Sequence, residues 1–389
     1  MKRLIRYFDH FIYVCLLVFV FTVPLSIAVS EGIFILALIG WGVKIAVEKK
    51  LHWQRTPLDV PIMLFVAIAF FSSFWGVNVK TSLTGFRTYG LILIIYLILN
   101  NVREPGRAKI LVWGLIGGAL VLSICTVSDR LGRLASGGNP VLAGSMSEAG
   151  QLLIVIGVTS GLLLYQKEKK AKMFLIAALL IMILAEIFNF KRGSWAALIL
   201  VFIIQGWIRR KKIIPVIIVA AALLFLFQPV RERLFALKSE LSPLRGGRLA
   251  MWETVPGILR EHPMGIGVDN VGSVMYKYNA SIEKGHSHVH NTPLQILLEL
   301  GPLGLMAFIW WMVVFLKISY TAFRNIKDEN IYEKSLMFGI FSAFVGFLIN
   351  GMVEFNFGDS EVVMIVYILM GLTLLIRDRN DMDICRERF

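Results

Sequence analysis

The residues best suited to chemistry form a short histidine-rich stretch, GHSHVH at residues 285–290, which NTP and a long apolar segment follow. A neutral imidazole can take a proton from a hydroxyl near pH 7, so His286, His288 and His290 are candidates for a general base. In an extended backbone these alternating residues would share one face, an arrangement that could also hold zinc. Because no cysteine and no adjacent acidic residue joins them, the base is favoured over the metal. A third interpretation, a solvated polar cap on the following helix, stays open.

Composition indicates what kind of structure must position these side chains. Of the 389 residues, 57% are of the apolar types AVILMFWYC and 17% are charged, and the mean hydropathy is +0.72. Soluble domains average about 45–50% apolar residues and about 25% charged residues. The chain is therefore predicted to be an all-α, polytopic membrane protein. Its net charge of +14 would suggest a nucleic-acid partner in a soluble protein, but the preference of cytoplasmic loops for Lys and Arg explains much of it, so no such partner is expected.

Apolar windows of spanning length predict about twelve transmembrane helices. They lie at residues 11–29, 32–47, 60–76, 83–99, 109–128, 149–165, 172–189, 194–208, 213–229, 293–316, 335–353 and 360–376. The seventh and eighth windows are so close that one long kinked helix is an alternative there.

These windows divide the chain into three parts. Residues 1–229 carry the first nine helices, and residues 293–389 carry the last three and a cytoplasmic tail. Residues 230–292 are expected to form one large outer loop, in which 230–241 and 248–261 are predicted to be short amphipathic helices.

The distribution of charge predicts the orientation of the bundle in the membrane and the side on which its functional groups lie. Most of the 40 Lys and Arg residues fall on the side of the two termini, which the positive-inside rule assigns to the cytoplasm. The remaining ionisable residues gather at the outer helix ends, where such groups usually have a function. Carboxylates are nearly absent from the middle of the predicted spans, which argues against a proton- or sodium-coupled transporter.

Three segments resemble the O-antigen ligase and O-antigen polymerase superfamily. Residues 290–304, HNTPLQILLELGPLG, resemble its His-Asn signature. Residues 191–195, KRGSW, resemble its Arg-Gly segment at the outer end of a middle helix. Arg248, Trp252, the stretch HPMGIG at 262–267 and Asn270 resemble the second half of its large periplasmic loop. The resemblance is close from residue 191 to about residue 304, and it extends to the first half of the chain by hydropathy only.

The resemblance implies a fold like that of C-type membrane glycosyltransferases and a glycan transfer at the periplasmic face of the bacterial inner membrane. The donor would be a glycan linked to undecaprenyl diphosphate, and no metal or cofactor would be needed. Arg192 and Arg248 would bind the diphosphate, since guanidinium holds phosphate oxygens bidentately. His290 would be the general base. Lys191, His288 and Asn291 would support the site.

The identity of the acceptor leaves three functions open. A ligase would join the O-antigen polysaccharide to a lipid A-core hydroxyl, whereas a polymerase, or another glycan-joining enzyme of the superfamily, would use the same site with a different acceptor. The third function, from another class, is a flippase or transporter of a lipid-linked solute. The single large outer loop favours the ligase, because polymerases of the family typically have two sizeable periplasmic loops.

The orientation can be tested with single cysteines in place of Lys238, in the loop, and Lys327, on the predicted inner side. A membrane-impermeant thiol reagent added to intact spheroplasts should label position 238 and leave position 327 unlabelled. The opposite pattern would invert the topology and remove the predicted active site from the periplasm.

Overall fold

The computed structural model describes residues 2–50, 53–102, 104–138, 143–212, 214–215, 218–219, 222, 228–235, 247–283 and 285–387. All regular secondary structure in these ranges is helical. The helices are α1 (Lys2–Thr22), α2 (Ile27–Glu48), α3 (Asp59–Trp75), α4 (Val79–Gly85), η1 (Phe86–Ile92), α5 (Leu93–Asn101), α6 (Pro105–Ala135), α7 (Met146–Tyr165), α8 (Lys169–Phe188), α9 (Arg192–Arg209), α11 (Gln228–Phe235), α13 (Arg248–Glu261), α14 (Val271–Val274), η4 (Met275–Lys277), α15 (Thr292–Asn325), α16 (Ile331–Gly351) and α17 (Ser360–Glu387).

Within the described residues, nine helical segments are long and apolar enough to cross a membrane, and α3 is a shorter apolar helix. The nine are Arg3–Thr22, Ile27–Glu48, Val79–Asn101, Pro105–Ala135, Met146–Tyr165, Lys169–Phe188, Thr292–Asn325, Ile331–Gly351 and Ser360–Asn380. The prediction of an all-α, polytopic membrane protein is therefore confirmed. The predicted window 213–229 lies mostly outside the described residues, as does residue 236 onward of the predicted helix 230–241, so the count of twelve stays a prediction.

Two predicted boundaries change in the structure. The first window, 11–29, runs through a break between α1 and α2, because Pro24 lacks a backbone N–H and restricts the residue before it. Ser26 then caps α2 by accepting a hydrogen bond from the backbone N–H of Val29. The alternative of one kinked helix over 172–208 is wrong, since α8 and α9 are separate helices and Phe190 between them has a φ of 54°.

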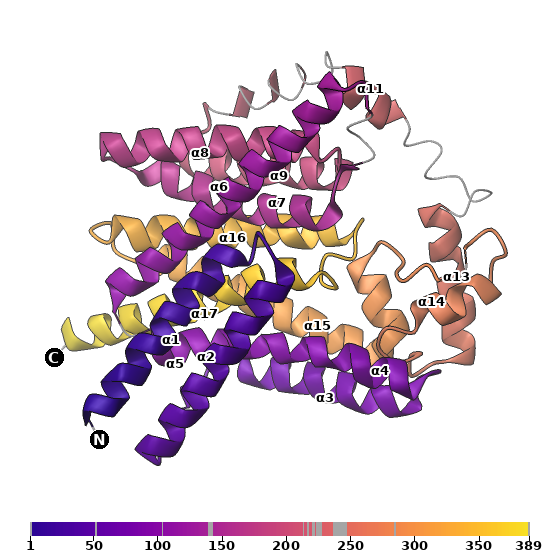
Figure 1. Ribbon diagram of the computed structural model, residues 1–389, viewed down its shortest axis with the longest axis horizontal. Coiled ribbons are helices and arrows are strands. Elements are labelled where there is room, and N and C mark those ends of the chain that lie inside the picture. The colour runs from indigo at the N-terminus through magenta and orange to yellow at the C-terminus, as the bar shows by residue number, and fades with distance from the viewer. Residues whose placement is uncertain are drawn as a thin grey trace.

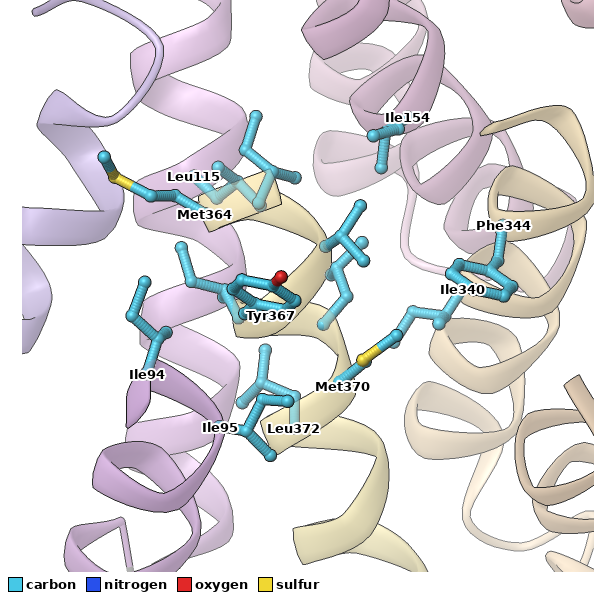
Figure 2. Close-up of a cluster of buried hydrophobic side chains, with 14 of the residues drawn as sticks. Ile94, Ile95, Leu115, Ile154, Ile340, Phe344, Met364, Tyr367, Met370 and Leu372 are labelled. Atoms are coloured by element: carbon cyan, nitrogen blue, oxygen red, sulfur yellow. The ribbon is translucent and has the colours of Figure 1, made fainter. Parts of the chain in front are cut away.

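The helices form a bundle with both termini at one end and α13 and α14 at the other (Figure 1). Glycine allows very close packing of α7 on α16, where a Cβ on Gly161 would lie 2.3 Å from the Cα of Gly339. Further inside, α17 packs against α5, and Figure 2 shows Ile94 and Ile95 of α5 beside Tyr367 of α17. This arrangement places the outer loop over one end of a well-packed core.

A break in α15 attaches the outer loop to the bundle. Gly301 has a φ of 69° and a ψ of −174° inside this helix, which interrupts the helical hydrogen bonding. The backbone N–H of Ile266 donates to the carbonyl of Leu298 (2.8 Å), and that of Gly267 donates to the carbonyl of Glu299 (3.0 Å). The HPMGIG stretch is thus bonded through its main chain to the first turns of a membrane helix.

The same stretch also contacts the turn between α3 and α4. The carbonyl of Ile266 accepts a hydrogen bond from the N–H of Val77 (2.9 Å). The fully buried side chain of Asn270 donates to the hydroxyl of Ser82 (2.7 Å). The outer loop therefore joins the first turn of α4 to the start of α15, and the histidine-rich stretch ends in the same region.

Replacement of Gly267 by alanine should destabilise the protein strongly. Gly267 has a φ of 86°, and an added Cβ would lie 2.6 Å from the Cα of Gly76. The combined strain and steric overlap should cost about 2–4 kcal/mol. Gly285 is a matched control, because its φ is 94° and nothing lies within 4 Å of its added Cβ. Gly285→Ala should cost only about 1 kcal/mol. Melting temperatures in detergent would measure both effects, and equal losses would contradict the docking of the loop.

Candidate functional site

The carboxylate of Glu354 lies between the two residues that the sequence analysis assigned to base and diphosphate chemistry. Its Oε1 is 2.6 Å from Nδ1 of His290, and its Oε2 is 3.0 Å from Nη2 of Arg248. Glu354 is in the turn between α16 and α17, His290 is directly before α15, and Arg248 begins α13. Three segments that are far apart in the sequence thus meet at one carboxylate.

Hydrogen bonds between two helix ends hold His290 beside Glu354. Asn291 caps α15 by accepting from the N–H of Leu294, and its amide donates to the carbonyl of Met352 (2.7 Å) at the end of α16. The hydroxyl of Thr292 is 3.0 Å from the carbonyl of Glu354. His290 itself has a φ of 51°. Asn291, and not His290, therefore caps the helix, which leaves the imidazole available for other contacts.

Arg248 is positioned by the helix that it begins. Gly247 is the N-cap of α13, and the predicted helix over 248–261 is confirmed with the same bounds. One turn further on, the indole Nε1 of Trp252 donates to the carbonyl of Val289 (2.9 Å), directly before His290. The acidic partner of Arg248 is distant in the sequence: it is Glu354, 106 residues away.

The three imidazoles form one cluster. Nε2 of His286 is 3.4 Å from Nε2 of His290. The ring of His288 lies edge-on to that of His290 with a centroid separation of 4.2 Å, and the rings of His286 and Phe355 each lie 6.0 Å from it. The three rings come together although the backbone is not extended at His290, whose φ is 51°, because the turn there folds the preceding residues back over it.

Burial and neighbouring charges shift the pKa values of the groups around His290. Burial and the neighbouring His290 lower the pKa of His288 to about 4, and the same two causes lower the pKa of His286. Burial alone would raise the pKa of Glu354, but the hydrogen bond and charge of His290, together with Arg248, outweigh it and lower the pKa. At neutral pH the site therefore contains an ionised carboxylate and two neutral imidazoles around His290.

The donor atoms of His288, His290 and Glu354 lie within 4.8 Å of one another, close enough to share a metal ion. No acidic residue is adjacent to the histidines in the sequence, but the fold brings Glu354 to them from the α16–α17 turn. Both oxygens of Glu354, however, already contact His290 and Arg248, and the fixed positive charge of the guanidinium opposes a bound cation. The donor set fits a metal poorly, and metal-independent chemistry stays our prediction.

Arg192 and Lys191 lie at the start of α9, next to the same turn. Lys191 is the N-cap of α9 and Arg192 its first residue, and both side chains are half-buried. A Cβ on Gly193 would lie 2.7 Å from Cγ2 of Val353, the residue before Glu354. The glycine of the KRG motif therefore lets α9 approach the turn closely. This brings Arg192 to the end of the bundle where Glu354 contacts Arg248 and His290.

Glu354 is a candidate functional residue that the sequence alone does not single out. It was expected only as one of several ionisable residues at outer helix ends. A carboxylate directly after an apolar span, with no cationic neighbour in the sequence, was the available signal. Its partners could not be identified, because pairing over 64 and 106 residues depends on how the helices pack.

Acidification should destabilise the loop through His288. Its pKa is about 4 in the folded protein and 6.5 when exposed, so between these values the unfolded loop binds a proton that the folded loop does not. Stability is therefore full above about pH 6.5 and falls as the pH approaches 4. Between pH 7 and pH 5 the loss should be about 1 kcal/mol after allowance for partial exposure. Melting curves at both pH values should show a smaller acid-induced shift for His288→Gln than for the wild type; equal shifts would contradict this assignment.

Comparison with known proteins agrees with the motifs. Residues 177–309 match the family model described as O-antigen ligase, a range that includes Arg192, Arg248 and His290 and ends before Glu354. A protein of Rickettsia conorii is 25% identical over 81% of this chain and 79% of its own length. One of Rickettsia felis is 27% identical over 81% and 80%, respectively. Both carry the provisional name polysaccharide ligase. These matches confirm the resemblance to the O-antigen ligase superfamily, and within it to ligase-like members.

Proposed function

We propose that this protein joins O-antigen polysaccharide, carried on undecaprenyl diphosphate, to a hydroxyl of the lipid A-core at the periplasmic face of the inner membrane. The observation that carries the proposal is the shared carboxylate of Glu354, which contacts the proposed base at 2.6 Å and the proposed diphosphate ligand at 3.0 Å. The names of the Rickettsia relatives support glycan ligation as the reaction class.

His290 acts as the general base in this proposal. Its Nδ1 faces Glu354 at 2.6 Å, so Nδ1 carries the proton and Nε2 has the lone pair. The carboxylate keeps this tautomer and stabilises the imidazolium that forms when Nε2 takes the proton of the acceptor hydroxyl. His286, 3.4 Å from the same Nε2, occupies the position of that hydroxyl and must give way to it.

Arg248 and Arg192 bind the leaving group. The acceptor oxygen forms a bond to the anomeric carbon while the bond from that carbon to the phosphate oxygen breaks, and the electron pair stays on the diphosphate. Guanidinium groups stabilise this charge because they are always ionised and donate two parallel hydrogen bonds to phosphate oxygens. The contact to Glu354 uses Nη2 of Arg248, and the other N–H groups of its fork can point to the donor.

The energy of the lipid-diphosphate sugar bond drives the transfer, because no ATP is available outside the inner membrane. The protein then needs only to position both substrates, to accept one proton and to stabilise the negative charge that develops on the diphosphate. We accordingly assign no metal or cofactor to the reaction, and Lys191, His288 and Asn291 have supporting roles. The alternative, an O-antigen polymerase, would use the same residues with a different acceptor.

The base assignment predicts the behaviour of purified variants. His290→Ala should leave donor binding largely intact and lower transfer from an undecaprenyl-diphosphate donor by about 10²–10⁴-fold, the scale for loss of a general base. His286→Ala and His288→Ala should lower transfer much less, because Glu354 still orients His290. Glu361→Gln, which changes a carboxylate on the first turn of α17, is a control that should retain activity.

Two results would refute this chemistry. Full activity of His290→Ala would remove the base, and equal losses in the three histidine variants that added zinc restores would indicate a metal site. The acceptor is tested separately by the lipopolysaccharide banding pattern of a strain that lacks the protein. Accumulated lipid-linked long chains would support the ligase, whereas single-repeat material would indicate the polymerase.

A further inference from the structure

A cavity of about 220 Å³ lies beside the cluster of His286, His288 and His290 and has no role in the chemistry described above. The aromatic residue Phe355, which follows Glu354, lines this cavity and also contacts the ring of His288 at a centroid distance of 6.0 Å. The other walls come from η1, from the loop before α14, and from α15 and α17. The polar and aromatic side chains that line the cavity include Tyr89, Asp269, Glu299, Phe357 and Tyr367.

The charge of the cavity distinguishes it from the diphosphate site. Two carboxyl residues, Asp269 and Glu299, line it, and no lysine, arginine or histidine is among the described residues that do so. The described lining therefore offers a diphosphate no cationic partner. Aromatic rings next to carboxylate acceptors suit a neutral molecule that has both an apolar face and hydroxyl groups, which are the properties of a sugar ring.

Glu299 is held ready to accept a hydrogen bond. Its side chain is 5% exposed, and its Oε1 accepts from Nε2 of Gln295 (2.7 Å) and from the N–H of Asp269 (3.1 Å). The donors to Glu299 among the described residues all use Oε1, so Oε2 is the oxygen left for a ligand hydroxyl. The volume of about 220 Å³ is below the usual range for drug-sized ligands, and it suits a single ring better than an oligosaccharide.

Neither Arg192 nor Arg248 lines the cavity. α9, which begins with Arg192, lies on one side of α16 and α17, and α4, which leads into η1, lies on the other (Figure 1). A diphosphate at the arginines and a sugar ring in the cavity could therefore bind at the same time. His290 would lie between them, where the acceptor hydroxyl must meet the anomeric carbon.

We propose that this cavity binds a neutral sugar ring of the acceptor and thereby holds the attacking hydroxyl against His290. The proposal rests on the transfer function proposed above and adds a binding site for one of its two substrates. It assigns acceptor recognition to Glu299 and Tyr89, and it separates acceptor recognition from the arginines that bind the donor.

Two threonines one turn apart provide a matched test. Thr88 lines the cavity, whereas Thr84 does not, and both side chains are exposed and donate to a backbone carbonyl at 2.9 Å. Thr88→Trp should fill part of the cavity and raise the KM for lipid A-core acceptor at least 10-fold, with the Kd for the undecaprenyl-diphosphate donor changed less than 2-fold. Thr84→Trp should change neither value. Glu299→Gln, which keeps the side-chain shape, should also raise the acceptor KM.

A binding measurement keeps this proposal separate from the proposed function. The probe is deacylated core oligosaccharide, titrated onto wild-type protein and onto Thr88→Trp in the absence of donor. Weaker binding to the variant supports the subsite even if the wild type transfers nothing, a result that would refute only the transfer reaction. Equal binding and equal acceptor KM in well-folded Thr88→Trp would overturn the proposal. A selective loss of donor affinity would overturn it too, because the cavity would then receive the donor sugar.

Discussion

The arrangement of the site depends on one partly buried carboxylate. Placing Glu354 in a largely desolvated turn is unfavourable unless opposite charge and hydrogen bonds compensate it, and Arg248 and His290 supply both. Each partner is in turn held by a helix end, Arg248 by the start of α13 and His290 by the cap of α15. The ionised carboxylate therefore joins the start of α13, in the outer loop, to the start of α15 and to the α16–α17 turn.

Much of the architecture could be predicted from the sequence, because spans and caps are local properties. Apolar windows identified the helices, and the window at 293–316 begins one residue after the first residue of α15. The position of Glu354 beside His290 could not be predicted, since hydropathy says where a helix is and not which helix packs against it. The contact of His286 with His290 could not be derived either, because it depends on a positive φ at His290 that reverses the chain, and no residue type at that position indicates it.

The motifs that indicated the superfamily include two kinds of residue. Arg192, Arg248 and His290 have side chains suited to the reaction. Gly265 and Gly301 matter instead because two backbones approach so closely that a Cβ on Gly265 would lie 2.5 Å from the carbonyl oxygen of Glu299. A signature can thus reflect the packing of a loop on a helix as much as chemistry, and only the structure separates the two.

The interrupted helix α15 also affects how the outer loop moves. The amide protons of Ile266 and Gly267 belong to an extramembrane segment but are bonded to carbonyls of a membrane helix. Their exchange with water is therefore tied to the opening of α15, and the loop cannot lift there as a hinged lid. In the proposed reaction, the two lipid-linked substrates would reach such a site by diffusion within the plane of the bilayer. Their encounter would then depend on their density per unit of membrane area and not on their concentration in the periplasm.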